Sequence, residues 1–183
     1  RATDYVSQMM DMISKLISLS FAYPTKDGHV FFEVATFSDY GRLSNKKLSE
    51  LKEGVRIENE DTKKNPLDFV LWKPSNPEEP GWESPWGRGR PGWHIECSAM
   101  AKDILGDQFD IHGGGIDLIF PHHENEIAQS TCSNNMKKFA NFWLHNGFLK
   151  IEGEKMSKSL NNFLTVYDLI QRDFSGPAIR YNM

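Results

Sequence analysis

The segment from Lys155 to Ser159 holds two lysines and two serines. Two lysines beside hydroxyl groups can bind a triphosphate and neutralise the charge that develops on it during adenylate formation. A solvated basic loop is the alternative for two lysines taken alone. The segment is therefore a candidate ATP-binding loop, with Lys155 and Lys158 as its cations and Ser157 and Ser159 as its hydroxyl groups.

A thiol, an imidazole and a carboxylate are spaced so that they can converge on a metal ion. Cys97 lies on one predicted helix, and His122 and Glu126 are four residues apart on the next, which places both on one helix face. All three groups are zinc ligands in proteins. The alternatives are a buried cysteine that packs as a small hydrophobic residue and a histidine that caps a helix. His123 lies three residues before Glu126, so the spacing leaves open which histidine would bind the metal.

Two further features can contact small molecules. A predicted glycine turn follows a strand and consists of His112, Gly113, Gly114 and Gly115. Glycines let a ligand approach the backbone closely. Open α/β sheets bind ligands at the carboxyl ends of their strands, which is where this run lies. Asp117, two residues after the run, could therefore bind a ribose hydroxyl or an amino group. A tight connection without a ligand is the alternative. Trp93 lies one helical turn before Cys97 and is either the wall of a pocket or a core residue.

The elements that position these residues alternate between helix and strand from Trp93 onward. Helices and strands are expected over 93–105 (helix), 108–111 (strand), about 122–132 (helix), 142–149 (strand) and about 165–173 (helix). A tight loop is expected over 153–159. Alternation of elements of this length predicts a parallel α/β sheet.

The first part of the chain has a different pattern. Apolar residues at helical spacing predict an amphipathic helix with Thr3 or Asp4 as its N-cap. These apolar residues are Val6, Met9, Met10, Ile13, Leu16 and Ile17. A hairpin is expected around Asp27-Gly28, and a short helix over 46–52.

Residues 74–92 are rich in proline and glycine, which excludes a long regular element from this stretch. The stretch follows a strand expected over 69–72 and contains Trp82 and Trp86. We therefore expect an ordered loop held by aromatic packing, at the return from an insertion into the main fold.

Composition narrows the class of protein. The chain has 183 residues and a net charge of −4, which gives no electrostatic footprint for nucleic acid over the chain as a whole. Cys97 and Cys132 do not make a disulfide framework, so a reduced, cytoplasmic compartment is expected. No apolar run approaches the roughly 20 residues that span a bilayer, so no membrane partner is expected. A helix is expected from the first residues of the chain, and another is expected to begin only at its last residues. This pattern predicts that the chain is an internal piece of a longer protein.

Five strings occur in one order along the chain, and together they closely resemble the cysteinyl-tRNA synthetase family of class I aminoacyl-tRNA synthetases. They are GWHIECSAM at 92–100, HGGGIDL at 112–118, FPHHENE at 120–126, WLHNGFL at 143–149 and KMSKS at 155–159. Residues 65–72 and 84–87 are similar to the connective insertion of that family. The resemblance covers the whole chain.

The resemblance implies an α/β fold that is the second half of a class I Rossmann-type, parallel-sheet catalytic domain with an α+β connective insertion. The implied divisions are 1–20 for a helix of the Rossmann domain, 21–91 for the insertion, 92–175 for the second half of the Rossmann domain with the KMSKS loop, and 176–183 for the start of a helical region.

The resemblance also implies a reaction, in which cysteine is activated by ATP with Mg²⁺ and transferred to tRNA(Cys), bound mainly through regions outside this chain. Cys97, His122 and Glu126 match the family's zinc ligands and are expected to converge on one point beside Trp93, which matches its pocket tryptophan. The implied catalytic residues are Lys155 and Lys158, and the implied ATP-binding set adds Ser157, Ser159, residues 112–115 and Asp117. Zinc prefers a thiolate to an alcohol, so the metal would select cysteine over serine.

Two departures from the family pattern stand out. The HIGH motif and a fourth zinc ligand, an upstream cysteine, are not in this sequence, and KMSKS is followed by Leu160-Asn161-Asn162 instead of Leu-Gly-Asn. Asn161 tolerates positive φ, so the turn is expected to survive. The alternatives are a cysteine ligase of mycothiol synthesis, which the string at 143–149 and the insertion disfavour, and a catalytically silent, substrate-binding fragment.

Overall fold

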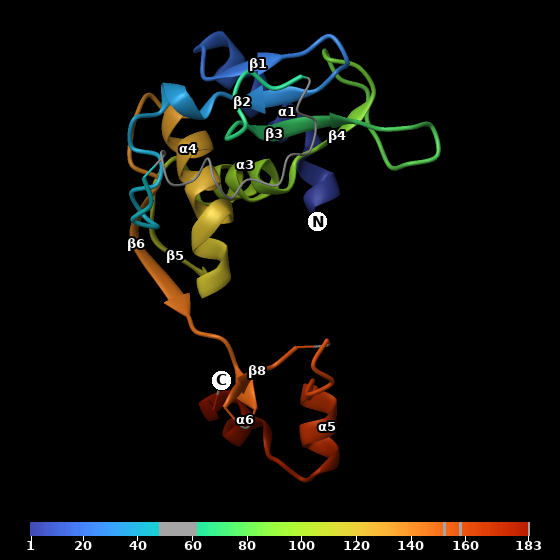
Figure 1. The fold of residues 1–183 in the computed structure, drawn as a ribbon, viewed down its shortest axis with the longest axis vertical. Helices are drawn as coiled ribbons and strands as arrows, with labels where there is room; N and C mark the ends of the chain where they lie inside the picture. The colour runs from blue at the N-terminus through green and yellow to red at the C-terminus, as the bar shows by residue number, and fades with distance from the viewer. Residues whose placement is uncertain (48–61, 152, 158, 183) are drawn as a thin grey trace. The chain divides into compact units, whose positions relative to one another are not determined.

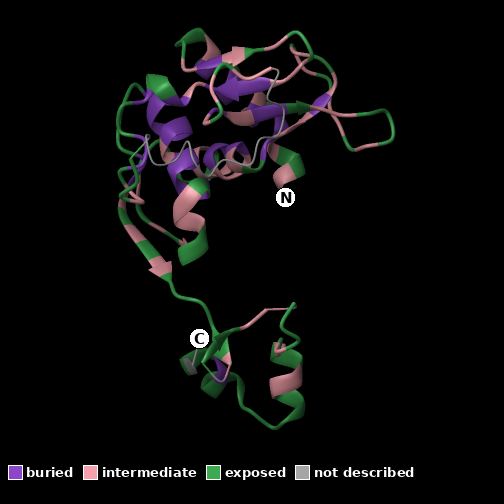
Figure 2. Ribbon diagram, viewed as in Figure 1, coloured by how far each residue is buried: buried purple, intermediate pink, exposed green. Residues whose placement is uncertain are grey.

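The computed structural model describes the chain over 1–47, 62–151, 153–157 and 159–182. The chain forms two compact units, Arg1–Leu144 and His145–Met183 (Figure 1). Buried residues are concentrated in the first unit (Figure 2). No helix in the described ranges is long and apolar enough to traverse a bilayer.

The first unit opens with the 3₁₀ turn η1 (Ala2–Tyr5), which runs directly into helix α1 (Val6–Ser18). The prediction of an amphipathic helix is confirmed, and its buried positions are Val6, Met9, Met12, Ile13 and Leu16. The predicted N-cap is wrong, because Thr3 and Asp4 lie inside η1 and Tyr5 takes the N-cap position of α1.

Four short strands form an antiparallel sheet in the order β1-β2-β3-β4. They are β1 (Ala22–Pro24), β2 (Val30–Phe32), β3 (Phe69–Pro74) and β4 (Gly89–Pro91). Strands β1 and β2 are the predicted hairpin, and Gly28 in its loop has a φ of 87°, which favours glycine. Phe32 stacks on Phe21 and on Phe69, with ring centroids 6.5 and 5.0 Å apart. Helix α1 packs against β1 and β4.

The loop between β3 and β4 is ordered by its tryptophans, as predicted. Trp82 donates its backbone N–H to the Gly89 carbonyl at 2.7 Å, and the Gly89 N–H donates back at 3.0 Å. Trp86 packs on Trp72, with ring centroids 5.8 Å apart. The helix predicted over 46–52 is not seen at residues 46 and 47, and its remaining residues lie outside the described ranges.

Helix and strand then alternate as the sequence predicts. The elements are α3 (Trp93–Leu105), β5 (Phe109–Gly115), α4 (Glu124–Ser133) and β6 (Ala140–Asn146). Strands β5 and β6 pair in parallel. Phe109 lies beside Phe139 and Gly113 lies beside Leu144, so the residue numbers rise in the same direction along both strands. Helices α3 and α4 pack against each other. The α/β class is therefore confirmed.

Three boundaries differ from the prediction. The run from His112 to Gly115 is the end of β5, not a turn, because its pairing with β6 keeps these glycines extended. The turn follows in η3 (Ile116–Leu118) and in the π-helical segment η4 (Ile119–His123), where extended Phe120 delays the start of α4 to Glu124. Strand β6 starts two residues earlier than predicted and ends before Gly147.

The second unit contains a small hairpin and two short helices. They are β7 (Lys150–Ile151), β8 (Glu154–Lys155), α5 (Val166–Gln171) and α6 (Gly176–Asn182). Helix α5 is capped by Thr165, whose hydroxyl accepts from the Asp168 N–H while the Asp168 carboxylate accepts from the Thr165 N–H. It is shorter than predicted, because Asp173 takes a φ of 61° and cannot continue the helix.

Candidate metal centre and phosphate-binding loop

Cys97, His122 and Glu126 converge in the first unit. One ligand atom from each lies within 4.8 Å of the others. Cys97 comes from α3, His122 from the π-helical segment η4, and Glu126 from the first turn of α4. The packing of α3 against α4 and of η4 against the start of α4 brings them together. The structure therefore groups the three residues whose types and spacing suggest zinc.

The imidazole and the carboxylate are already paired. His122 Nε2 lies 2.8 Å from Glu126 Oε1, and both side chains are buried. Burial by itself would lower the pKa of His122, but its contacts with Cys97 and Glu126 outweigh burial and raise the pKa to about 9. Burial would raise the pKa of Glu126, but His112 and His122 outweigh it and hold that pKa below its ordinary value. The group is thus a cationic imidazole on an anionic carboxylate, which suits a site that a metal enters by displacing a proton.

The two carboxylate oxygens of Glu126 differ in their partners. Glu126 Oε2 is buried and accepts no hydrogen bond from the described residues. His112 Nε2 lies 3.3 Å away, at ion-pair distance but outside hydrogen-bond geometry. A buried carboxylate oxygen without a hydrogen bond costs free energy, and a bound cation would remove that cost.

A second group shares the same carboxylate. His112, His123 and Glu126 also present ligand atoms within 4.8 Å of one another. The His112 and His123 rings lie edge to face with centroids 4.8 Å apart, and Trp143 of β6 packs on both at 4.7 and 5.1 Å. His112, predicted to contact ATP, therefore lies beside Glu126 in this structure. Trp143 received no role from the sequence, although it opens the string at 143–149.

The glycines of β5 fit closely around the histidines. A Cβ at Gly114 would lie 2.9 Å from His123 Cε1, whereas one at Gly113 would meet Leu144 O at an ordinary 3.5 Å. Asp117 lies in η3, and its carboxylate oxygen would be 2.5 Å from a Cβ at Gly115. Glycine is thus needed at 114 by packing against a ring, which the sequence could not reveal.

Trp93 and His94 complete the surroundings of His122. The Trp93 ring lies 4.5 Å from the His122 ring between centroids, yet 59% of Trp93 remains exposed, so it is not a core residue. His94 Nδ1 lies 2.8 Å from His122 Nδ1. Burial and the neighbouring charge of His122 lower the pKa of His94 to about 4. The sequence offered no reason to single out His94 within the string at 92–100.

The KMSKS loop lies in the second unit, and the side chain of Asn162 makes two hydrogen bonds to its backbone. Asn162 Oδ1 accepts from the Ser157 N–H at 2.8 Å, and Asn162 Nδ2 donates to the Lys155 carbonyl at 3.1 Å. Ser157 Oγ lies 3.1 Å from Ser159 Oγ. Lys155 Nζ lies 3.6 Å from the centroid of the Phe148 ring. Lys158 lies outside the described residues.

The turn after this loop adopts the predicted conformation. Asn161 has a φ of 51°, in the left-handed region that asparagine tolerates better than most residues. Asn161 therefore holds a conformation that favours glycine, and its neighbour Asn162 makes two hydrogen bonds to the loop. The expectation that the turn survives is confirmed.

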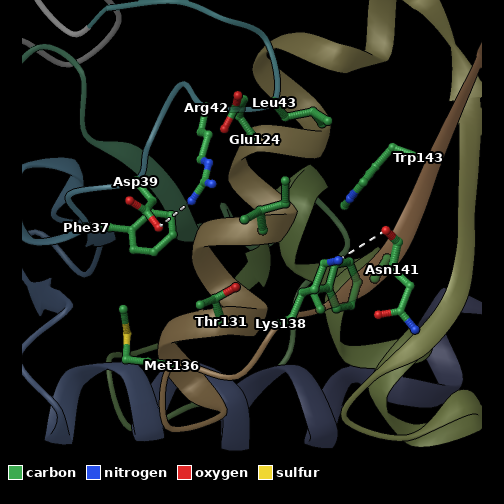
Figure 3. Close-up of a pocket in the computed structure, with 13 residues that line it drawn as sticks. Phe37, Asp39, Arg42, Leu43, Glu124, Thr131, Met136, Lys138, Asn141 and Trp143 are labelled. Atoms are coloured by element: carbon green, nitrogen blue, oxygen red, sulfur yellow. Dashed lines mark hydrogen bonds and ion pairs between the residues drawn. The ribbon is translucent and has the colours of Figure 1, made fainter.

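A cavity of about 590 Å³ lies elsewhere in the first unit, between the loop of Asp39 and Arg42, helix α4 and the start of β6 (Figure 3). Its charged groups are engaged within the protein. Arg42 Nη1 lies 3.6 Å from Asp39 Oδ2, and Lys138 Nζ donates to the Asn141 carbonyl at 3.2 Å. Cys97, His122 and Glu126 do not line this cavity, so it is separate from the metal-ligating group.

The family follows from a match over the entire chain. Residues 1–183 match the family described as tRNA synthetases class I (C) catalytic domain. The chain belongs to this family. Cys97, His122 and Glu126 and the KMSKS segment all lie within the residues that match this family.

Several relatives of this chain are named cysteine–tRNA ligase. A cysteine–tRNA ligase of Ruegeria pomeroyi is 58% identical over 182 residues, which are 99% of this chain and 39% of the relative. One of Pelagibacter ubique is 62% identical over 168 residues, 92% of this chain and 37% of the relative. One of Paramagnetospirillum magneticum is 61% identical over 183 residues, 100% of this chain and 39% of the relative. The chain thus spans well under half the length of the relatives that it matches.

Proposed function

We propose that the full-length protein to which this chain belongs is a cysteine–tRNA ligase, which activates cysteine with ATP to cysteinyl-adenylate and transfers it to tRNA(Cys). The observation that carries the proposal is the convergence of half-buried Cys97 with buried His122 and Glu126. The identity of 58–62% to relatives named cysteine–tRNA ligase supports the same reaction.

In this proposal Cys97, His122 and Glu126 hold a zinc ion. The unbonded Glu126 Oε2 and the mixed set of soft and hard donors support this choice. His122 is favoured over His123 because it groups with both Cys97 and Glu126, and its Nε2 lies 2.8 Å from Glu126 Oε1. His123 groups instead with His112 and Glu126. When bound, zinc supplies a soft Lewis acid that binds a cysteine thiolate in preference to the hydroxyl of serine.

The protein's own residues shape the remainder of the substrate site. Trp93 stands exposed against the His122 ring, where it can wall the pocket for the small side chain of cysteine. A wall of this kind discriminates by shape alone only weakly between cysteine and serine, which differ in one atom. In this proposal, the preference for cysteine over serine therefore depends on the zinc ion that Cys97, His122 and Glu126 hold.

The ATP-binding residues in this proposal lie in two stretches of the chain, the KMSKS loop and the end of β5, each within its own compact unit. Lys155, Lys158, Ser157 and Ser159 bind the phosphates with Mg²⁺, and the lysines act as catalytic residues by meeting the charge that grows as pyrophosphate leaves. The extended backbone from His112 to Gly115 and the carboxylate of Asp117 contribute contacts to the nucleoside. Binding of tRNA(Cys) falls mainly to the rest of the protein, since this chain carries a net charge of −4.

The divisions of the chain follow the same proposal. The antiparallel sheet β1-β2-β3-β4 belongs to a connective insertion over 21–91, between a Rossmann helix at 1–20 and the second Rossmann half at 92–175. Residues 176–183 begin a helical region. The antiparallel pairing of β1 to β4, against the parallel pairing of β5 and β6, supports this division.

The decisive experiment measures exchange of pyrophosphate into ATP and the charging of tRNA by the full-length protein. Exchange should depend on cysteine and be far weaker with serine, and the aminoacyl group should pass to tRNA(Cys) rather than to an aminosugar-inositol acceptor. Cys97→Ala should lose bound zinc and cysteine-dependent exchange, while Cys132→Ala, which removes the other thiol, should keep both. Retention of zinc by Cys97→Ala would contradict the proposed ligand set.

A further inference from the structure

His94 and His122 face each other through the same ring atom. Their Nδ1 atoms lie 2.8 Å apart, and the ring centroids are 4.9 Å apart. His94 lies in the first turn of α3, one turn before Cys97, and His122 lies in η4, immediately before α4. The contact therefore joins helix α3, which carries the candidate ligand Cys97, to the candidate ligand His122.

The contact constrains the protons of both rings. Two ring nitrogens at 2.8 Å form a hydrogen bond only when one carries a proton and the other offers a lone pair. The opposite nitrogen of His122, Nε2, is the one that faces Glu126 Oε1, at 2.8 Å. A metal bound at Nε2 needs the lone pair of that atom, so the ring proton must then reside on Nδ1. His94 Nδ1 is the acceptor placed to receive it.

His94 is held firmly enough to act on its neighbour. Its backbone carbonyl accepts from Gln129 Nε2 of α4 at 3.0 Å, and the same Nε2 donates to Ser98 Oγ of α3 at 2.9 Å. The side chain of Gln129 is fully buried. The His94 ring stands edge-on to Phe69 of β3, with centroids 6.0 Å apart. Helix α3, helix α4 and the antiparallel sheet thus all fix the position of this ring.

We propose that His94 is a positioning residue for metal binding: its Nδ1 accepts a hydrogen bond from the Nδ1–H of His122 and so holds His122 in the tautomer whose Nε2 can bind zinc. The inference rests on the zinc site of the proposed function. Outer partners of metal-ligating histidines are usually carboxylates, backbone carbonyls or water, and their loss typically weakens metal binding by roughly 10- to 100-fold. Here the partner is a second histidine.

The test uses two nearly isosteric substitutions in the full-length protein. His94→Leu removes the acceptor, whereas His94→Asn keeps a carbonyl oxygen near the position of Nδ1. Zinc affinity is measured by competition with a chelator of known strength, and the ligand field is read from the visible absorption of the Co²⁺-loaded protein. We expect His94→Leu to weaken zinc binding by roughly 10- to 100-fold and to shift the Co²⁺ bands. His94→Asn should recover most of the affinity.

Each other outcome has a definite meaning. Equal weakening in both variants, in step with an equal fall in their denaturation midpoints, would show that His94 only packs and would overturn the inference. Wild-type zinc affinity in His94→Leu would overturn it as well. If the wild-type protein itself binds no zinc, the metal in the proposed function fails first, and the inference falls with it. The wild-type measurement therefore separates the two failures.

Discussion

Glu126 presents its two carboxylate oxygens to two different histidines. Oε1 pairs with His122, and Oε2 faces His112 without a hydrogen bond. The spacing of residues in the sequence left His122 and His123 as equal candidates, because both lie within one turn of Glu126. The side-chain directions separate them, since His122 groups with Cys97 and His123 groups with His112. Rotamers and the π-helical turn before α4 decide this, and neither can be read from spacing.

Position 114 has no room for a side chain beside His123. Gly114→Ala would place a methyl group 2.9 Å from His123 Cε1 and 3.0 Å from Leu118 Cδ1, so the buried ring must move. We expect a destabilisation of about 1–3 kcal/mol, as is typical of overpacking, and weaker zinc binding by the full-length protein. Gly113→Ala is the matched control, because its methyl group would meet only an ordinary contact at 3.5 Å. Denaturation midpoints and zinc affinity measure both effects, and equal behaviour of the two variants would refute the steric account.

At the scale of elements, prediction succeeded where a local pattern determines the structure. Helix α3 has the predicted bounds, and the hairpin around Asp27-Gly28 forms as expected. It failed for the run from His112 to Gly115, which was interpreted as a turn because glycine is common there. The pairing of β5 with β6 keeps this run extended, and strand pairing is a tertiary contact that local propensity does not contain.

Asp68 ties the antiparallel sheet to its connections. This buried carboxylate accepts from Tyr23 Oη at 2.7 Å, from the Val34 N–H at 3.0 Å and from the Asn65 N–H at 3.1 Å. Asp68→Ala should destabilise the protein by about 3 kcal/mol, because it leaves these donors without their acceptor. Asp11→Ala, on the exposed face of α1, is the control and should change stability by less than about 0.5 kcal/mol. A shift of the urea midpoint in Asp68→Ala no larger than in the control would contradict this role.

Asn162 should order the KMSKS loop through its two hydrogen bonds to the backbone of the loop. Asn162→Ala removes the acceptor of the Ser157 N–H and the donor to the Lys155 carbonyl. Two such hydrogen bonds contribute about 1–3 kcal/mol to the order of the loop, so adenylate formation should slow about tenfold or more. Asn161→Gly is the control, since glycine accepts the φ of 51° without strain and leaves Asn162 in place. Pyrophosphate exchange by the full-length protein measures both, and equal slowing in the two variants would argue against the hydrogen bonds.

At the scale of the whole molecule, the two candidate sites lie in different compact units. The metal-ligating group belongs to Arg1–Leu144, and the KMSKS loop belongs to His145–Met183. The sequence predicted both sites as local strings, because each string is short and specific. The spacing of His122 and Glu126 predicted that they share one face. It did not predict that α3 packs against that face, because Cys97 and His122 are more than twenty residues apart in the chain. The role of His94 was invisible for the same reason.

Lys158 and the metal-ligating group can be tested separately, because they lie in different units. Replacement of Lys158 by alanine in the full-length protein should slow cysteine-dependent pyrophosphate exchange far more than it weakens cysteine binding, because the charge that the lysine meets grows in the transition state. Zinc content should be unchanged, since Cys97, His122 and Glu126 all lie in the other unit. Lys150→Ala, which replaces an exposed lysine of β7 in the same unit, is the control and should leave exchange near the wild-type rate.

Exchange at several cysteine concentrations separates kcat from KM. A rise in KM that matches the fall in kcat would mean that the lysine supports substrate binding as much as the reaction, and a loss of zinc would mean that the two units depend on each other for the metal site.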